Sequence, residues 1–195
     1  MGERDADPAE RASGPLPPAA AWRAVGRCVA SSTRLLVQRR VHLPREHVGR
    51  VIRFGDGTTA RVYRETTTTR PAAVAPCFLV VGFRLRLVRG PGHVAFEWES
   101  LLNTPLFVGF PGFVSKLWLA HDQTGRYRGL YEWDGAGPAS AYAGALWHVL
   151  ALVSEADSID YRVLSDVRRD AVLDEPGLLG QRDGTHEWWR PVGMS

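Results

Sequence analysis

Aromatic and polar side chains between residues 83 and 133 offer the clearest chemistry in this sequence. Tyr131 and Trp133 alternate near the end of the string 126–133, and Phe83 lies within the apolar string 77–88. A phenol O–H or an indole N–H on a pocket wall can hydrogen-bond a phenolate or enolate oxygen. We therefore take Tyr131 and Trp133 as candidate catalytic residues and Phe83 as a candidate substrate-binding residue. The alternative is that all three only fill the core.

Three more residues are candidates for substrate contact. Asn103 follows a stretch with helical spacing at 94–102, so its amide either orients a substrate oxygen or caps that helix. Trp98 lies within the stretch and is either a substrate platform or core. Phe110 lies in the aromatic loop 107–113, whose two glycines would let the loop either gate a pocket or form a packed connection.

These residues lie on a predicted βαββαβ unit. Its elements are a strand at 77–88, a helix at 94–102, strands at 114–120 and 126–133, a helix after Pro138 with its stripe at Tyr142, Leu146, Val149 and Val153, and a strand at 159–164. The order is the split-βαβ or ferredoxin-like arrangement of the α+β class.

Alternation along the strands predicts which face each side chain takes. If Lys116 pairs with Glu132, both lie with Arg84 in a charge ladder on the face without helices, which also carries Phe78, Val80 and Trp118. The residues expected under the helices are Ser115, Leu117, Leu119, Tyr127, Tyr131 and Trp133. A face that mixes apolar groups with paired charges suits a partner sheet, so we expect a homodimeric barrel. A catalytic role for the charges is the alternative.

The rest of the chain divides into three segments. Residues 1–19 are expected to form a disordered leader, and 20–70 a helix and a β-hairpin around Gly55-Asp-Gly57. The barrel domain is expected at 77–170. A tail at 171–195 carries Glu187-Trp-Trp-Arg190, which we expect to dock on the barrel or on a partner subunit.

Composition narrows the class of protein. The chain of 195 residues is 45% apolar, carries a net charge of +3 and has no dense basic run, so nucleic acid is not an expected partner. We expect neither a membrane-spanning segment nor a secretion signal, and hence a cytoplasmic protein. Cys28 and Cys77 stand apart from any metal-ligand spacing, and we expect no metal and no cofactor.

His148 falls about 130° from the centre of its helix stripe, which points it outward or toward the N-terminal extension.

Three strings carry a family resemblance. Phe113-Val-Ser-Lys-Leu-Trp-Leu-Ala120, Thr124-Gly-Arg-Tyr-Arg-Gly-Leu-Tyr-Glu-Trp133 and Ala141-Tyr142 resemble the YdhR-like monooxygenase family of the dimeric α+β-barrel superfamily. The resemblance implies a homodimer with a small-molecule pocket between each sheet and its helices. It implies a cofactor-independent monooxygenase-like or cyclase-like enzyme for an aromatic or polyketide-type molecule. The alternatives are a non-catalytic binding or accessory protein and a haem-binding member of the superfamily.

Overall fold

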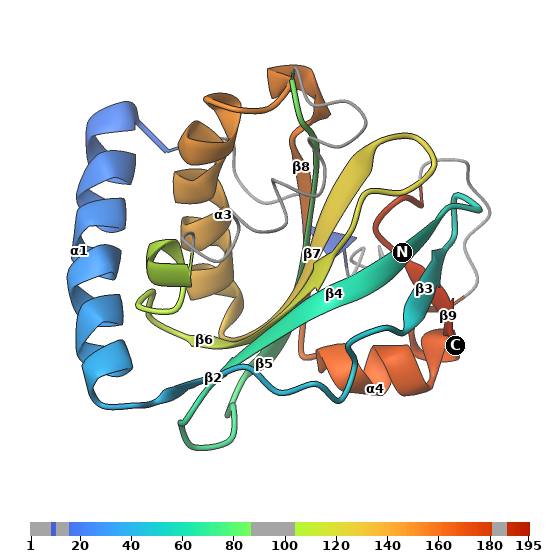
Figure 1. Cartoon of the computed structure of the whole chain (residues 1–195), viewed down its shortest axis with the longest axis horizontal. Helices are drawn as coiled ribbons and strands as arrows, with labels where there is room; N and C mark the ends of the chain where they lie inside the picture. The colour runs from blue at the N-terminus through green and yellow to red at the C-terminus, as the bar shows by residue number, and fades with distance from the viewer. Residues whose placement is uncertain (1–8, 11–15, 87–103, 181–186) are drawn as a thin grey trace, which may run out of the picture.

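The computed structural model describes residues 9–10, 16–86, 104–180 and 187–195, and the chain there has an α+β fold built on one curled antiparallel sheet (Figure 1). The sheet runs in the order β1-β8-β5-β7-β6-β4-β3-β9, and β2 pairs with β4 beside this path. The strands are β1 (Ala9–Glu10), β2 (Val41–His42), β3 (Val51–Phe54), β4 (Thr59–Thr68), β5 (Pro76–Arg84), β6 (Phe113–Leu119), β7 (Arg126–Asp134), β8 (Asp160–Ser165) and β9 (Pro191–Met194).

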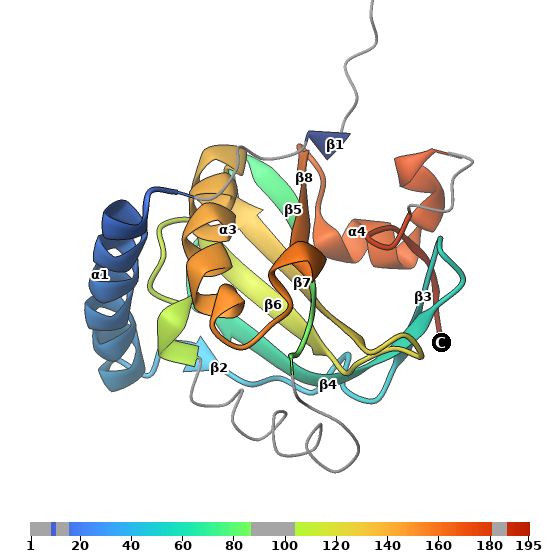
Figure 2. The same cartoon turned by 90° about the horizontal axis from the view of Figure 1, so that it is seen from above.

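Helices lie on both sides of this half-barrel. They are α1 (Pro18–Val37), α3 (Ala136–Ala151) and α4 (Arg169–Asp174), with short 3₁₀ turns at Thr104–Leu106, Ala156–Ser158 and Pro176–Leu179. Figure 2 shows α3 against one face of the sheet with α1 outside it, and α4 beyond the other face. None of the described helices is long and apolar enough to cross a bilayer.

Strand β5 is an interior strand of the sheet, and both of its faces are apolar. Leu79 and Val81 point toward α3, Phe78 and Val80 point the other way, and all four are buried. A strand buried on both faces has this near-continuous apolar run. The strands predicted at 77–88, 126–133 and 159–164 are confirmed within a few residues by β5, β7 and β8. The predicted helix at 94–102, with Trp98 and Asn103, lies outside the described residues.

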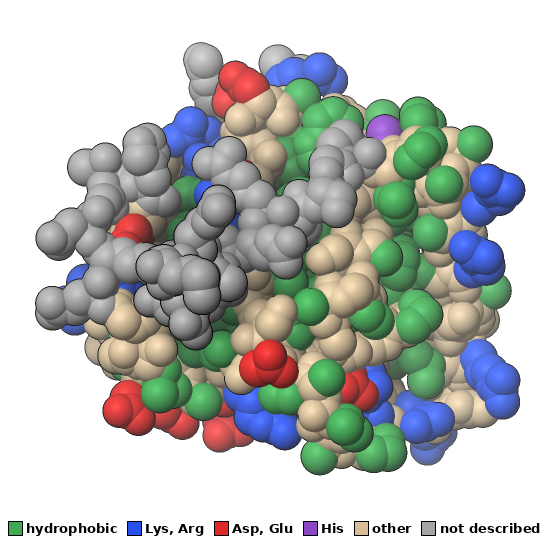
Figure 3. Space-filling view, turned by 180° about the vertical axis from the view of Figure 1, so that it is seen from behind, with side chains coloured by type: hydrophobic (Ala, Val, Ile, Leu, Met, Phe, Trp, Pro, Cys, Tyr) green, Lys and Arg blue, Asp and Glu red, His purple; other side chains and the backbone are tan. Residues whose placement is uncertain are grey.

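The N-terminal half is part of the sheet rather than an appendage. The predicted hairpin is confirmed as β3–β4, and β4 continues to Thr68, where it pairs with β6 over five residues from Val62 to Thr67. Helix α1 packs on α3 and on the 3₁₀ turn at Thr104. In the view from behind, basic side chains follow the edge of the molecule formed by α1, with apolar side chains between them (Figure 3).

The register of β6 corrects the predicted charge ladder. Lys116 lies opposite Tyr131, and Glu132 lies opposite Ser115, because an irregularity between Phe113 and Ser115 shifts the pairing by one residue. Such a shift exchanges the faces of every following side chain. Lys116 and Trp118 therefore point toward α3, contrary to the prediction, and Glu132 points away from it, while Arg84 lies opposite Arg126. The ladder of Arg84, Lys116 and Glu132 does not form.

The face predicted to meet a partner sheet is already covered by its own chain. Phe78 and Val80 are fully buried in a cluster with Val172 of α4 and with Trp188 and Trp189. The indole of Trp188 lies so close to Gly82 that a Cβ atom there would come within 2.5 Å of it. The prediction that the Trp pair docks on the barrel is confirmed, and it fills the place assigned to a second subunit.

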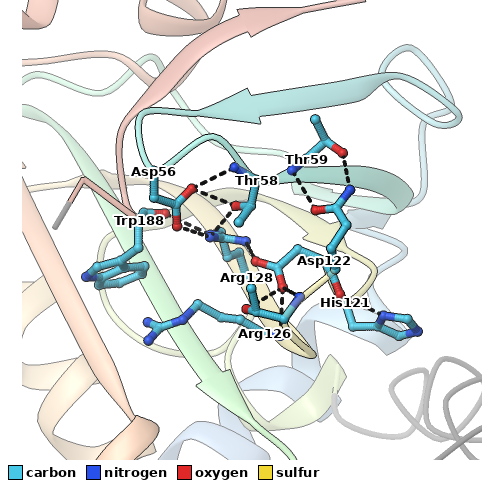
Figure 4. Close-up of polar contacts among 10 residues, drawn as sticks. Asp56, Thr58, Thr59, His121, Asp122, Arg126, Arg128 and Trp188 are labelled. Atoms are coloured by element: carbon cyan, nitrogen blue, oxygen red, sulfur yellow. Dashed lines mark hydrogen bonds and ion pairs between the residues drawn. The ribbon is translucent and has the colours of Figure 1, made fainter. Parts of the chain in front are cut away.

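Arg128 ties three separate turns together on this second face (Figure 4). Its Nη1 donates to Asp122 Oδ2 at 2.6 Å, its Nη2 to Asp56 Oδ2 at 3.1 Å, and its Nε to the carbonyl oxygen of Trp188 at 2.8 Å. Burial opposes ionisation of Asp122, but hydrogen bonds from Thr124 and the charge of Arg128 hold the pKa of that carboxyl below its ordinary value. The guanidinium thus fixes the β3–β4 turn, the β6–β7 turn and the C-terminal segment.

Replacing Arg128 by Leu should lower the free energy of unfolding by about 3–5 kcal/mol, because it leaves Asp122 buried without its cation. Urea unfolding measures this change. The double variant R128L/D122L should recover part of the loss, since it removes the buried charge as well. Arg50→Leu, at an exposed position, is the control and should stay within about 0.5 kcal/mol of wild type. Equal losses for R128L and R50L would contradict this role.

Candidate functional site

A cavity of about 490 Å³ lies between α3 and the face of the sheet that α3 covers. This volume is within the range of small-molecule sites. The walls come from β4, β5, β6, β7 and α3, and most of the side chains on them are aromatic or aliphatic. The residues that matter most for chemistry are Tyr63, Phe83, Lys116, Trp118, Tyr131 and Tyr142.

Tyr131 and Tyr142 form a hydroxyl pair on the cavity wall. Tyr142 of α3 donates to the Tyr131 oxygen at 3.1 Å. The ring of Tyr131 lies along β7 over Gly129, where a Cβ atom would come within 2.6 Å of the ring. Burial is the main cause that raises the pKa of both phenols, so both keep their protons at neutral pH. Because Tyr131 accepts from Tyr142, its own hydrogen is left to donate to a ligand.

Lys116 brings a buried amine to the same wall. Its side chain is 6% exposed, and Nζ lies 3.1 Å from the centre of the Trp118 ring. The rings of Phe107 and Tyr131 are each 4.7 Å away. Within the described ranges no carboxylate forms an ion pair with Lys116. The aromatic faces attract a cation but provide no counter-ion.

A second cation lies on the same indole. The guanidinium carbon of Arg64 is 4.6 Å from the Trp118 ring centre, and Arg64 also donates to the hydroxyl of Thr104. Trp118 is held in place by its own N–H, which donates to Thr66 at 3.1 Å. Burial first, and the charge of Arg64 second, lower the pKa of Lys116 well below its ordinary value of 10.5. The site therefore favours the neutral amine.

Helix α1 fixes the segment that closes the cavity beside β6. The Ser32 hydroxyl donates to the carbonyl oxygen of Pro105 at 2.7 Å. Gly109 touches the backbone of α1, where a Cβ atom would come within 2.2 Å of the Cys28 carbonyl oxygen. These contacts hold the turn that carries Phe107, whose ring meets Trp118 edge-on at 5.2 Å. Helix α1 thus holds in place the turn whose Phe107 side chain forms part of the cavity wall.

The residues predicted as a pocket from sequence divide into two groups. Phe83 and Tyr131 line the cavity. Trp133 and Phe110 do not, since both pack against Tyr142, with ring centres 4.9 Å and 5.1 Å from it. The indole nitrogen of Trp133 is buried and has no hydrogen-bond partner among the described residues. Trp98 and Asn103 lie outside those residues.

Two of the charged residues predicted on the dimer face, Lys116 and Glu132, lie on opposite faces of the sheet. Lys116 belongs to the cavity, whereas Glu132 accepts from Arg168 at 3.1 Å on the opposite face. Sequence reasoning missed Lys116 as a cavity residue, although one signal was present. It is the one charged residue in the string 113–120, where apolar residues occupy both alternating sets. The Nε2–H of His148 donates to the carbonyl oxygen of Leu16, so this side chain points toward the N-terminal part of the chain, one of the two directions predicted for it.

Comparison with models of known families, with curated proteins and with solved structures finds no match to this chain. Within the described ranges, no group of three or more His, Cys, Asp or Glu side chains is placed to hold a metal ion. The resemblance to the YdhR-like family therefore stays a prediction. The cavity's own residues carry the functional argument.

Lys116→Met should stabilise the protein at neutral pH. Folding lowers the pKa of Lys116 from its ordinary value of 10.5. At a pH between the folded-state pKa and the unfolded-state pKa, the unfolded chain binds more protons than the folded protein, so the free energy of unfolding of wild type rises with pH. K116M has no amine to titrate at this position. Its excess free energy of unfolding over wild type should therefore shrink by up to about 1.4 kcal/mol per pH unit between those two pKa values. Urea unfolding of both proteins from about pH 6 to about pH 9 measures the difference. Parallel stability curves would contradict a neutral buried amine.

Proposed function

We propose that the cavity binds a flat, mainly apolar small molecule bearing a carbonyl or phenolic oxygen, and that the protein is a monooxygenase-like or cyclase-like enzyme. The observation that carries the proposal is the position of Lys116. Its amine faces an aromatic cavity without an acidic partner among the described residues, and the hydroxyl-bearing ring of Tyr131 is 4.7 Å away. A base and a hydrogen-bond donor at one apolar site are the groups needed to form a substrate anion.

The first step is proton abstraction. The neutral amine of Lys116 takes a proton from an acidic C–H or O–H of the substrate and becomes an ammonium. The negative charge moves to the substrate oxygen, where the Tyr131 O–H donates a hydrogen bond and the new ammonium supplies the counter-charge. Lys116 and Tyr131 are both buried, and the low local dielectric of a buried site strengthens both interactions.

Two outcomes follow from such an anion. In the monooxygenase-like branch it reacts with dioxygen, so that a CH₂ group becomes a C=O group, one oxygen atom stays in the product and the other leaves in water. In the cyclase-like branch the anion adds to a carbonyl carbon of the same molecule, and no oxidant is consumed. An aromatic or polyketide-type substrate has the acidic hydrogens that both branches need.

The haem-binding alternative does not fit the residues of this cavity. The helix histidine, His148, contacts the Leu16 carbonyl instead of the cavity, and no histidine is among the described lining residues. A non-catalytic binding protein would use the same cavity, and it differs from the enzyme only in turnover.

We also propose that the chain follows the ferredoxin-like βαββαβ order. The antiparallel order β8-β5-β7-β6 supports this, because it places the first strand of the unit between the third and the fourth. A homodimer and a cytoplasmic location remain predictions. A dimer would use a surface other than the one that α4, Trp188 and Trp189 cover.

Proton abstraction can be tested without dioxygen by using anthrone, whose CH₂ group is acidic and whose three rings are flat. Wild type should accelerate exchange of that CH₂ with deuterated water under nitrogen, as followed by NMR. Lys116→Met should lose about 10²- to 10⁴-fold of the acceleration and Tyr131→Phe about 10²-fold. In air, wild type should consume dioxygen with anthrone if the monooxygenase-like branch operates.

Tyr161→Phe is the matched control, because Tyr161 is outside the set of cavity-lining residues. It should exchange anthrone as wild type does. Lys116→Arg separates the roles of the amine, since an arginine keeps the charge but does not act as a base at neutral pH. If K116M exchanges as fast as wild type, Lys116 is not the base. If wild type binds anthrone without exchange, the protein is a binding protein for such molecules.

A further inference from the structure

Lys116 is the one lysine in the sequence of 195 residues. It lies on the central strand pair of the sheet, opposite Tyr131, and its side chain reaches the cavity. Among the described residues, its amine contacts the aromatic rings of Phe107, Trp118 and Tyr131. No described residue hydrogen-bonds to Nζ or neutralises it, so the nitrogen lone pair is open to a ligand.

The surroundings of this amine favour a nucleophile. A lysine becomes nucleophilic at neutral pH when it is desolvated in an apolar pocket or lies beside another cation. Both conditions are met here, since Lys116 is buried and Arg64 contacts the same indole of Trp118. An ammonium at this position would be next to a guanidinium, and among the described residues no carboxylate pairs with it, which disfavours the charged form.

We propose that Lys116 binds aldehydes and ketones covalently, as an imine, within the cavity. Nζ adds to the carbonyl carbon, the C–N bond forms, and the carbonyl oxygen leaves as water with the two hydrogens that the amine loses. The Tyr131 O–H is placed to donate to the carbonyl oxygen during the addition, because the Tyr131 ring is 4.7 Å from Nζ. No oxidant or reductant is needed.

This inference rests on the proposed function and narrows its substrate class to carbonyl compounds. An imine draws electrons from its neighbouring carbon, so the adjacent C–H becomes more acidic than in the free carbonyl. The same lysine would then promote formation of a carbon nucleophile, which serves the cyclase-like branch. The carbonyl compound should be flat and apolar, since most of the side chains on the cavity wall are aromatic or aliphatic.

The test uses 2-naphthaldehyde as the probe. The full chain is incubated with it at pH near neutrality, reduced with cyanoborohydride, and analysed by intact mass and peptide mapping. We expect one naphthylmethyl group on Lys116. The N-terminal amine, with an ordinary pKa near 8, reacts in every variant and serves as the internal reference.

Arg27→Lys is the matched control, because it places an ordinary lysine on the exposed face of α1. Lys116 should react at least about tenfold faster than this control lysine, since each unit of lowered pKa raises the neutral fraction tenfold. Leu146→Trp should slow the adduct at Lys116, because Leu146 lines the cavity and the larger side chain occupies it.

A second probe, 2-naphthol, separates this inference from the proposed function. It has the same rings but no carbonyl group, and its fluorescence reports binding. If 2-naphthol binds and Lys116 forms no adduct, or forms one only near pH 10, the imine is wrong and the cavity remains a binding site. If neither probe binds, the proposed function fails together with the imine.

Discussion

The need to bury both faces of the central strands determines the rest of this structure. Strand β5 is apolar on each side, and its neighbour β7 carries Tyr131 and Trp133 on one side and Leu130 on the other, so neither side is stable in water. One side is covered by α3 and the other by α4 and the C-terminal tryptophans. Each layer comes from a distant part of the chain, so the N-terminal helix, the hairpin and the tail are all parts of one fold.

The layers on the two faces of the sheet differ in how closely they pack against it, and this difference explains where a ligand can bind. On the C-terminal side the Trp188 indole lies directly on Gly82, and Arg128 closes the layer with hydrogen bonds to three turns. That side is a tightly packed core. On the α3 side the helix stands over aromatic rings that leave a cavity, and Lys116 and Tyr131 bring polar atoms to its wall. Chemistry is therefore expected on the α3 side.

The sequence predicted the elements better than their register. The faces of β5 and β7 follow from strict alternation, and the structure agrees with the prediction for both. The faces of β6 were reversed, because the irregularity after Phe113 leaves no mark in an alternation of apolar residues. That single shift moved Lys116 from a predicted dimer face into the cavity. The sequence left two docking places open for Trp188, the barrel or a partner subunit. Its contact with Gly82 joins residues about a hundred positions apart, and no local sequence pattern indicates such a contact.

The proposed chemistry requires a neutral amine of Lys116 in the cavity, and nuclear magnetic resonance of Lys116 tests this requirement most directly. Because the chain has one lysine, protein made with ¹³C-labelled lysine gives one set of side-chain signals, and the Cε shift follows protonation of Nζ. For a neutral amine in the cavity, the titration midpoint should lie well below the ordinary pKa of 10.5. A midpoint at or above that value would show an ordinary charged lysine and would contradict the proposed chemistry.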